Sequence, residues 1–315
     1  MPGDYWVEAR PTYNAGVIRR LRRFYRLALL GLHLLTGVLS ALIFPLLGPA
    51  RRDRVVGAWS ARLLRVMGLR AHFATPPDCP QGAMLVCNHV SWLDIYVILA
   101  ARHVHFVSKS EVRAWPVLGW LAARAGTLFV ERGRRTDTRR INDEMRSLMQ
   151  AGRWVALFPE GTTSDGRGLR RFLSSLLQPA IDLGCPVVPA ALRYTTADGK
   201  LSTDAAYIDN LSLLQSAIRI LDADGLVAEL RFGAPLPVAV SRRDLAVRAE
   251  DAVAGLLGIA RAPEGAFSQP GPRLVGPGVE LEDRQAGTSG DPPVASLSAP
   301  PPTNSRCPAP PDRGD

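Results

Sequence analysis

The chain has 315 residues, 47% of them hydrophobic, and a formal net charge of +9. A chain of this length and composition can bury one sizeable core with appended segments. The positive charge indicates an anionic partner, with membrane lipid, nucleic acid and acidic carrier proteins as the candidate classes. The four cysteines (Cys79, Cys87, Cys185 and Cys307) show neither a C-x-x-C spacing nor a paired framework, which fits a reducing compartment, and we expect free thiols.

An uncharged, apolar stretch covers residues 27–47. As a helix its 21 residues would be about 30 Å long, the thickness of a bilayer core, so it can span a membrane or dip deeply into it. Arginines flank it on both sides, and the positive-inside rule therefore gives no firm orientation. A cleaved signal peptide is disfavoured because LGPA at residues 47–50 is a poor cleavage site. A buried core helix is the other alternative.

Residues 55–69 form a second apolar segment, in which arginines are interleaved with Trp59, Leu63, Val66 and Met67. This pattern favours an interfacial helix that lies against anionic headgroups. We therefore expect residues 1–69 to be a basic N-terminus that carries a membrane-embedded helix and an interfacial helix.

Residues 70–262 alternate short apolar runs with amphipathic stretches, which is typical of a layered α/β domain. The predicted fold is α/β, a mixed sheet flanked by helices. The predicted strands are 84–87, 105–108, 127–130, 154–158, 187–192 and 227–232. The predicted helices are 91–101, 117–124, 137–150, 170–183, 211–221 and 241–257. Residues 263–315 hold 12 of the 26 prolines, which predicts a disordered tail that is dispensable for activity.

The heptapeptide NHVSWLD at residues 88–94 directly follows the first of these strands. A carboxylate that bonds one ring nitrogen of a histidine leaves the other nitrogen free to take a proton, as a general base requires. Five residues along a helix would turn the two side chains about 140° apart, so His89 is expected just before a helix and Asp94 in its first turn. The alternative interpretation is a plain capping box between Ser91 and Asp94.

Three further motifs follow or form predicted strands. Arg132 lies directly beyond the strand at 127–130, where it could bind a phosphate or carboxylate or simply be solvated. The turn PEGT at residues 159–162 could bring backbone N–H groups to the same sheet edge, or be an ordinary tight turn. Residues 187–192 are apolar with an internal proline, which suits the wall of a lipid channel, an edge strand or plain core.

In this order the four motifs resemble those of the glycerolipid acyltransferase superfamily, typified by bacterial lysophosphatidic acid acyltransferases, over roughly residues 85–192. The resemblance implies transfer of an acyl group from acyl-carrier protein or coenzyme A to a free hydroxyl of a lysolipid. It implies that His89 is the general base and Asp94 its orienting partner. The candidate substrate-binding residues are Arg132 as a contact to the acceptor headgroup, Glu160, Gly161, Thr162, Asn88 and Lys109.

The chemistry of acyl transfer fits these residues. An alcohol does not attack a thioester unaided at neutral pH, so a base must take its proton, and the same histidine can then protonate the departing thiol. Backbone donors around Gly161 could hold the oxyanion of the tetrahedral intermediate, a contribution of about 3 kcal/mol. We expect no metal and no cofactor other than the acyl thioester co-substrate. The resemblance also implies a catalytic domain that faces the cytoplasm at the inner membrane.

Thr163 bears on the identity of the acceptor. Many family members that take lysophosphatidic acid carry a basic residue at this point, and its loss should weaken the grip on a phosphate dianion. Residues 109–112, 115–120 and 158–172 also resemble the lyso-ornithine lipid branch of the superfamily. Because Arg132, Arg167, Arg170 and Arg171 could replace the missing charge, the first expected acceptor is 1-acyl-sn-glycerol-3-phosphate, which would give phosphatidic acid. A lyso-ornithine lipid is the second.

Other classes of protein fit less well. A serine hydrolase would need a Gly-x-Ser-x-Gly elbow and a phosphate-loop NTPase a Gly-Lys-Ser/Thr run, and the sequence has neither. A nucleic-acid partner is not expected, since no basic stretch is interleaved with aromatic residues. A non-catalytic, membrane-bound, lipid-binding scaffold stays open as the alternative of another class, because a sequence does not show that His89 is used.

Overall fold

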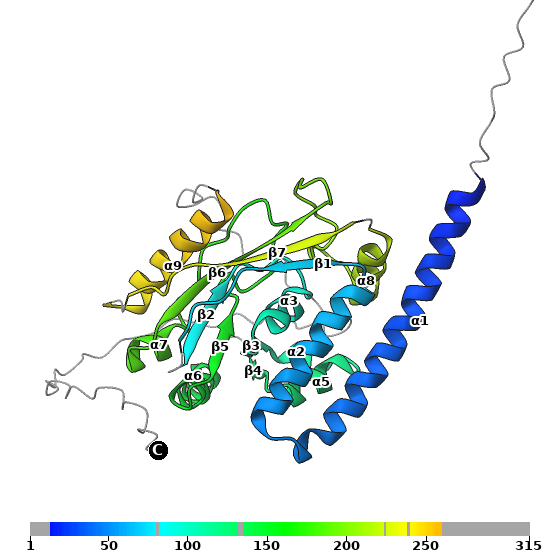
Figure 1. Ribbon diagram of the computed structural model, residues 1–315. Helices are drawn as coiled ribbons and strands as arrows, with labels where there is room; N and C mark the ends of the chain where they lie inside the picture. Colours follow the sequence, from blue (N-terminus) through cyan, green and yellow to red (C-terminus); the bar gives the residue numbers. More distant parts are fainter. Residues whose placement is uncertain (1–12, 80–81, 132–134, 224, 238–239, 260–315) are drawn as a thin grey trace, which may run out of the picture. The chain divides into compact units, whose positions relative to one another are not determined.

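The computed structural model describes residues 13–79, 82–131, 135–223, 225–237 and 240–259 (Figure 1). The tail predicted at 263–315, with Cys307, lies outside the described residues. In the described ranges the helices are α1 (Tyr13–Ile43), the 3-10 helix η1 (Phe44–Leu46), α2 (Pro49–Val66), α3 (Asp94–Ala101), α4 (Ser110–Arg113), α5 (Leu118–Arg124), α6 (Arg135–Gln150), α7 (Gln178–Leu183), α8 (Leu213–Asp222) and α9 (Arg242–Leu257). The strands are β1 (Arg70–Phe73), β2 (Ala83–Cys87), β3 (His105–Lys109), β4 (Leu128–Val130), β5 (Trp154–Leu157), β6 (Val187–Thr195) and β7 (Val227–Phe232).

Seven strands form one sheet in the order β1-β7-β6-β2-β5-β3-β4. Every neighbouring pair is parallel except β6 and β7, which run antiparallel, so the predicted mixed α/β sheet is confirmed. In the parallel run β2, β5, β3 and β4, the carboxyl ends of the strands lie at the same edge of the sheet. The loops after these four strands carry all but one of the motifs that the sequence singled out.

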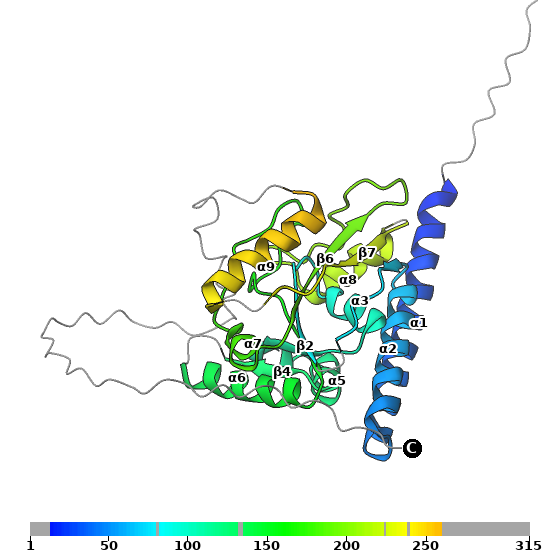
Figure 2. The same ribbon diagram turned by 60° about the vertical axis from the view of Figure 1, so that its left-hand side comes forward.

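Helices cover both faces of this sheet (Figures 1 and 2). One core contains side chains of α2, α3 and α8, and the other contains side chains of α6, α7 and α9. Strand β2 supplies Leu85 and Cys87 to the first core and Met84 and Val86 to the second. A strand that is covered on both faces reads as a continuous apolar run, which explains the sequence before Asn88. The three described cysteines are thiols rather than disulfides, as expected, and all three are buried.

The predicted helix at 170–183 is wrong, because only Gln178–Leu183 is helical. Before it, the backbone N–H groups are bonded to distant acceptors instead of to the preceding turn. The N–H of Arg170 donates to Glu160 and that of Phe172 to Glu250. The N–H of Leu173 donates to the carbonyl of Pro159. These bonds tie the segment to the PEGT turn and to α9, and the chain becomes helical only from Gln178.

Two strands of the sheet, β6 and β1, differ from what the sequence predicted. Strand β6 lies inside the sheet, between β2 and β7, and most of its side chains are buried, so the interpretation of residues 187–192 as core is correct and the edge-strand alternative is wrong. Strand β1 was not predicted from the sequence, because it is an edge strand that pairs with β7 alone and is largely exposed. An exposed edge strand has no apolar run to mark it.

Helix α2 corrects the interpretation of residues 55–69. Its apolar side does not face lipid headgroups, since Leu63 and Met67 are buried in the protein core. The ring of Trp59 stacks on His33 of α1 at a centroid distance of 4.4 Å. A pattern of apolar and basic residues does not tell a lipid surface from a protein core, and here the core takes the apolar side. The exposed side of α2 carries Arg51, Arg54, Arg62 and Arg65.

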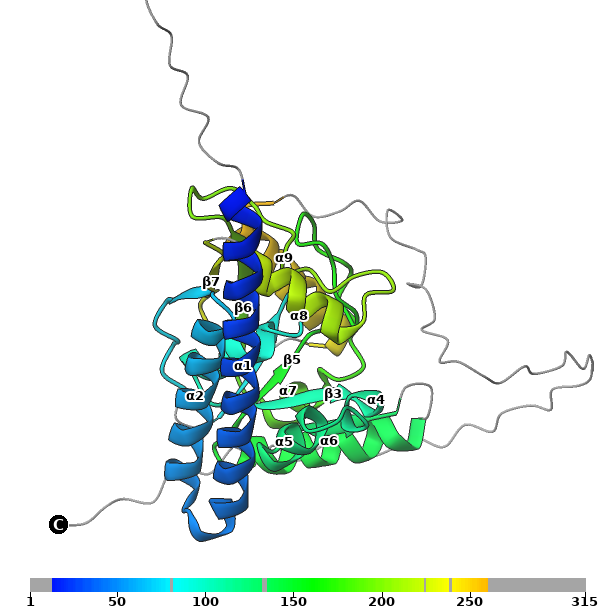
Figure 3. The same ribbon diagram turned by 90° about the vertical axis from the view of Figure 1, so that its right-hand side faces the viewer.

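Helix α1 lies against the domain at two separated points (Figures 1 and 3). The guanidinium of Arg23 donates to Asp222 at the end of α8, at 2.9 Å. Further along, Trp59 Nε1 donates to the carbonyl of His33 at 3.1 Å. Gly37 permits this close approach, because a Cβ there would lie 2.8 Å from the indole of Trp59. In the described part of the chain, residues Arg20–Leu46 form the one helical stretch that is long and apolar enough to cross a membrane.

Candidate active site

His89 and Asp94 meet at the carboxyl end of β2. The ring nitrogen Nδ1 of His89 lies 2.8 Å from Oδ2 of Asp94, which is the first residue of α3. The hydrogen bond expected from the spacing is therefore present. Nε2 of His89 has no hydrogen-bond partner in the described ranges, and 20% of the side chain is exposed.

The carboxylate of Asp94 is buried and accepts hydrogen bonds on both oxygens. Besides His89, Oδ2 accepts the backbone N–H groups of Val90 at 2.7 Å and Ser91 at 3.0 Å. Oδ1 accepts the hydroxyl of Tyr194 on β6 at 2.7 Å. The bond from the N–H of Ser91 is one half of the capping box that was the alternative interpretation, but α3 begins at Asp94 with no side-chain cap hydrogen bond, so the box is not formed. Sequence analysis missed Tyr194, which lies two residues beyond the predicted end of its strand.

The ring of Phe158 covers one face of the His89 imidazole. The two rings are stacked, with centroids 4.0 Å apart and planes 7° apart. Phe106 stacks in turn on Phe158, with centroids 5.6 Å apart. An imidazole held between its carboxylate partner and an aromatic face keeps one plane, which is the preorganisation that proton transfer needs. The sequence analysis did not assign either phenylalanine to the site.

Asn88 was predicted to bind substrate, but in the structure its side chain is bonded to β6. Its buried amide donates to the carbonyl of Leu192 at 2.9 Å and accepts the N–H of Leu192 at 2.7 Å. Both ends of the amide are thus bonded to β6, and a substrate would have to break these bonds to reach them. The structure assigns Asn88 to the scaffold that fixes the start of the His89 loop.

Glu160 is likewise bonded to the backbone on both carboxylate oxygens. Oε1 accepts the N–H of His89 at 2.7 Å, and Oε2 accepts the N–H of Arg170 at 2.9 Å. Burial raises the pKa of Glu160 to about 8, against the opposite pull of the two backbone donors. The side chain therefore joins the histidine loop to the loop that ends before α7, and any effect on substrate passes through His89.

In the PEGT turn, the backbone N–H groups that could bind an oxyanion are not that of Gly161, which was the expected donor. The N–H of Gly161 is bonded to the carbonyl of Phe158 at 3.0 Å and closes the turn, so it is not available for an oxyanion. The residue has a φ of 73°, a conformation that favours glycine. The N–H groups of Thr162 and Thr163 make no hydrogen bond with any described residue. The N–H of Ser164 donates to the carbonyl of His89 at 2.8 Å, which keeps the turn beside the histidine.

Of the two remaining predicted residues, Lys109 ends β3 and Arg132 comes after β4 in the chain. Lys109 is the last residue of β3, is half-buried, and pairs in register with Val130 of β4. It therefore lies at the same sheet edge as His89. Arg132 lies outside the described residues. Among the residues that the structure does describe, no group of three or more His, Cys, Asp and Glu side chains could hold a metal ion.

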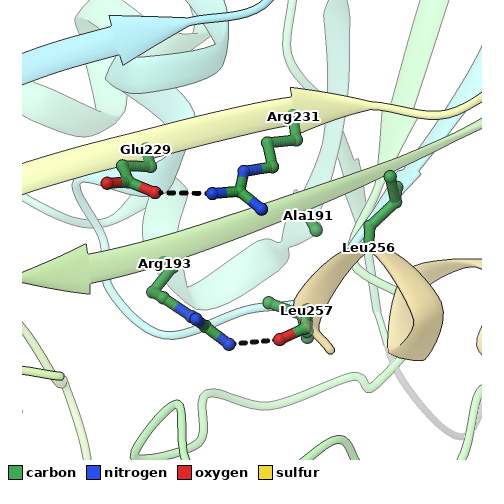
Figure 4. Close-up of a pocket in the computed structure, with 6 residues that line it drawn as sticks. All are labelled: Ala191, Arg193, Glu229, Arg231, Leu256 and Leu257. Atoms are coloured by element: carbon green, nitrogen blue, oxygen red, sulfur yellow. Dashed lines mark hydrogen bonds and ion pairs between the residues drawn. The ribbon is translucent and has the colours of Figure 1, made fainter. Parts of the chain in front are cut away.

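A hollow between β6, β7 and α9 is not a competing site (Figure 4). It measures only about 10 Å³, and its arginines are paired. Arg231 lies 3.2 Å from Glu229, and Arg193 donates to the carbonyl of Leu257. No histidine, cysteine or serine lines it, and its one carboxylate, Glu229, is paired with Arg231.

Comparison with known proteins gives consistent matches. The family described as "Acyltransferase" matches residues 71–193. The lyso-ornithine lipid O-acyltransferase of Pseudomonas aeruginosa is 38% identical over 204 residues, which cover 64% of this chain and 78% of that protein. The 1-acyl-sn-glycerol-3-phosphate acyltransferase of Neisseria gonorrhoeae is 39% identical over 162 residues, covering 51% of this chain and 64% of that protein.

The fold also matches a solved structure. The crystal structure of the 1-acyl-sn-glycerophosphate (LPA) acyltransferase PlsC from Thermotoga maritima superposes with a TM-score of 0.59 over 77% of this chain and 96% of that one. At 18% identity this likeness bears on the fold alone. Together with the sequence relatives, it confirms the resemblance from which the four motifs were interpreted: the chain belongs to the glycerolipid acyltransferase superfamily and is an acyltransferase.

Proposed function

We propose that the protein transfers a fatty acyl group from acyl-carrier protein or coenzyme A to the free hydroxyl of a lysolipid at a membrane. The observation that carries this proposal is the imidazole of His89, oriented by Asp94 through Nδ1 and free at Nε2. That arrangement is what an alcohol needs from a general base.

In the proposed reaction, Nε2 of His89 takes the hydroxyl proton as the lipid oxygen attacks the thioester carbonyl. The C–O bond forms, and the tetrahedral intermediate carries an oxyanion. The intermediate collapses with loss of the C–S bond, and the imidazolium returns its proton to the thiolate. Asp94 stays ionised throughout and stabilises the imidazolium. These steps use protein side chains and the two substrates, so no metal or cofactor enters the proposal.

The oxyanion donors in this proposal are backbone N–H groups of the PEGT turn and the residue after it. Gly161 is excluded by its bond to Phe158, and we assign the role to Thr162 and Thr163, whose backbone N–H groups have no partner in the described ranges. Backbone donors aimed at an oxyanion typically contribute about 3 kcal/mol to transition-state stabilisation. Gly161 then serves the oxyanion indirectly, because its left-handed backbone shapes the turn.

The first acceptor that we propose is 1-acyl-sn-glycerol-3-phosphate. Its phosphomonoester needs cations, and the sheet edge with His89 carries Lys109, while the loop after the PEGT turn carries Arg167 and Arg171. A lyso-ornithine lipid is the second candidate, favoured by a specific observation. Thr163 stands where a cation is common in family members that take lysophosphatidic acid, and its hydroxyl donates to the carbonyl of Tyr207, so this position supplies no charge to a headgroup.

A product assay distinguishes the two acceptors. Membranes that contain the protein would be offered a labelled acyl thioester with lysophosphatidate or with lyso-ornithine lipid, in separate reactions. Acylation of lysophosphatidate supports the first assignment. Acylation of the lyso-ornithine lipid alone would replace it by the second, and acylation of neither would remove the proposed acceptor class.

We further propose that α1 attaches the protein to one leaflet of the inner membrane, with the catalytic domain on the cytoplasmic side. One face of α1 is bonded to the domain through Arg23 and His33, so the helix cannot leave the domain to cross the bilayer alone. The opposite face is apolar and exposed, and consists of Val17, Ile18, Leu21, Phe24, Tyr25, Leu32, Leu35, Leu39, Leu42 and Ile43. A helix with these two faces suits burial in a single leaflet.

Charge placed on the exposed face of α1 tests this attachment. The double variant Leu35→Glu/Leu39→Glu should release the protein from membranes on carbonate extraction. The matched control Leu201→Glu, an exposed leucine beyond β6, should leave the protein in the membrane fraction. Wild-type protein in the supernatant would contradict the attachment.

A further inference from the structure

A second hollow lies at the opposite edge of the sheet from His89. It has a volume of about 70 Å³ and is lined by the start of α2, the residues that lead into β3 and β5, and the turn after α5. Strands β2, β3 and β5 are parallel, so the segments before β3 and β5 are at the amino end of these strands, whereas His89 follows the carboxyl end of β2. The hollow is therefore separate from the candidate active site.

The polar side chains on one side of this hollow are fully paired. Asp53 of α2 lies 2.8 Å from Arg153 and 3.3 Å from Nδ1 of His103. Arg153 also lies 3.3 Å from Nε2 of His105, whose Nδ1 is 3.1 Å from the carbonyl of Gly126. A carbonyl only accepts, so Nδ1 of His105 carries the proton, Nε2 accepts from Arg153, and the ring is neutral. Burial lowers the pKa of His103 to about 4, which makes this ring neutral as well.

The other side of the hollow carries positive charge that is not balanced. The hollow as a whole is lined by three guanidinium groups (Arg52, Arg124 and Arg153) and by a single carboxylate, that of Asp53. Arg153 shares that carboxylate, whereas Arg52 and Arg124 make no ion pair with any residue in the described ranges and only lie over the rings of Phe44 and Trp120. Nε of Arg52 is buried and has no hydrogen-bond partner there.

We propose that this hollow binds a phosphate-type anion between Arg52 and Arg124. A planar guanidinium without a carboxylate partner matches the oxygens of a phosphate, which can accept several N–H bonds. The volume suits a phosphate group and excludes an acyl chain. The site is independent of acyl transfer at His89, and it would tie the start of α2 to the sheet whenever the anion is bound.

Two sources of this anion share the same chemistry: the headgroup phosphate of a membrane phospholipid and free inorganic phosphate. The position favours the lipid. Arg52 follows η1 closely in the chain, and the apolar side chains of Leu42, Ile43 and Leu46 at that turn are exposed, Leu46 to 84%. Apolar side chains at a tip with arginines directly behind them would place the arginines at the depth of the headgroups.

The test measures thermal unfolding of the full chain in a neutral detergent. One arm adds inorganic phosphate, a second adds a short-chain phosphatidylglycerol, and a third adds sodium chloride at equal ionic strength. We expect the melting temperature to rise by about 3 °C at saturation in at least one phosphate arm and not with sodium chloride. A rise in the lipid arm alone assigns the site to a headgroup, and a rise in the inorganic arm alone assigns it to the free anion. No rise in either arm overturns the proposal.

Matched variants locate the effect. Arg52→Gln/Arg124→Gln should weaken the apparent affinity at least about tenfold. Arg62→Gln/Arg65→Gln removes the same charge from the exposed side of α2, outside the hollow, and should bind like the wild type. Asp53→Asn removes the one acid but keeps an acceptor for Arg153, and should tighten binding. Equal loss in both double variants, or weaker binding after Asp53→Asn, would show a general charge effect and overturn the site.

Discussion

The phenol of Tyr194 donates a hydrogen bond of 2.7 Å to Oδ1 of Asp94, on the opposite side of the carboxylate from His89. Burial and the nearby carboxylate raise the pKa of Tyr194 well above its usual value, so the hydroxyl stays a neutral donor. It therefore shares the negative charge of Asp94 without adding a charge of its own. This relationship makes Tyr194 a positioning residue that acts through Asp94.

Tyr194→Phe should lower kcat about tenfold, because Asp94 loses the bond that fixes its orientation toward His89, while KM for both substrates should change little. Negative charge then concentrates on the Asp94 oxygen that faces His89 and holds the imidazolium more strongly. The acid limb of the pH–rate profile should therefore move to higher pH. The control Tyr96→Phe removes a hydroxyl on α3 that has no partner in the described ranges, and should leave the profile in place. A purely structural role would lower stability and leave the profile of Tyr194→Phe unmoved.

Asp94→Asn should reduce kcat about 10³-fold with the fold retained, because an amide can accept the backbone N–H groups but cannot stabilise an imidazolium. The measurement is steady-state acyl transfer, with circular dichroism to show that the variant folds. Activity within tenfold of the wild type would mean that the carboxylate serves only to hold the backbone before α3.

Glu160→Gln should change how stability depends on pH. The pKa of Glu160 is raised to about 8 by burial, against an ordinary value near 4.5, so the folded state favours the neutral acid. The stability that this group contributes is present below pH 4.5 and is lost as the pH rises through 8. Urea unfolding of both proteins from pH 5 to pH 9 should show that the free energy of unfolding of the wild type falls relative to that of the variant as the pH rises. A difference that stays constant over this range would contradict the assignment.

Asn88→Ala tests whether Asn88 supports the loop or binds substrate. The change leaves the buried N–H and carbonyl of Leu192 without partners, which should lower the free energy of unfolding by about 2–4 kcal/mol. KM should stay within about twofold of the wild-type value, and kcat should fall because the His89 loop is less well fixed. A rise in KM with kcat unchanged would return Asn88 to the substrate-binding residues.

The pairing of His89 with Asp94 could be predicted from the sequence because it is local, and five residues around a helix start leave few geometries. The partners of that pair could not. Tyr194 is 100 residues from Asp94, and Leu192 is 104 residues from Asn88, so both contacts depend on β6 lying beside β2 in one particular register. Strand β2 was recognised because both its faces are buried, whereas β1, an exposed edge strand, leaves no such mark in the sequence.

Two further differences have physical causes that a periodic pattern does not contain. The segment 170–177 has helical composition, but the N–H groups of Arg170 and Phe172 are bonded to Glu160 and Glu250. The apolar side of α2 would suit lipid or protein equally, and only the folded chain shows that Leu63 faces the core. Likewise, Gly161 was expected to donate to an oxyanion, yet its N–H closes its own turn.

The most direct test of the central claim is single-turnover acyl transfer by His89→Ala, with labelled acyl thioester and lysolipid both saturating. If His89 removes the proton from the lipid hydroxyl, the rate of product formation should fall at least about 10³-fold while both substrates still bind. A rate within tenfold of the wild type, from a variant shown to be folded, would contradict the account.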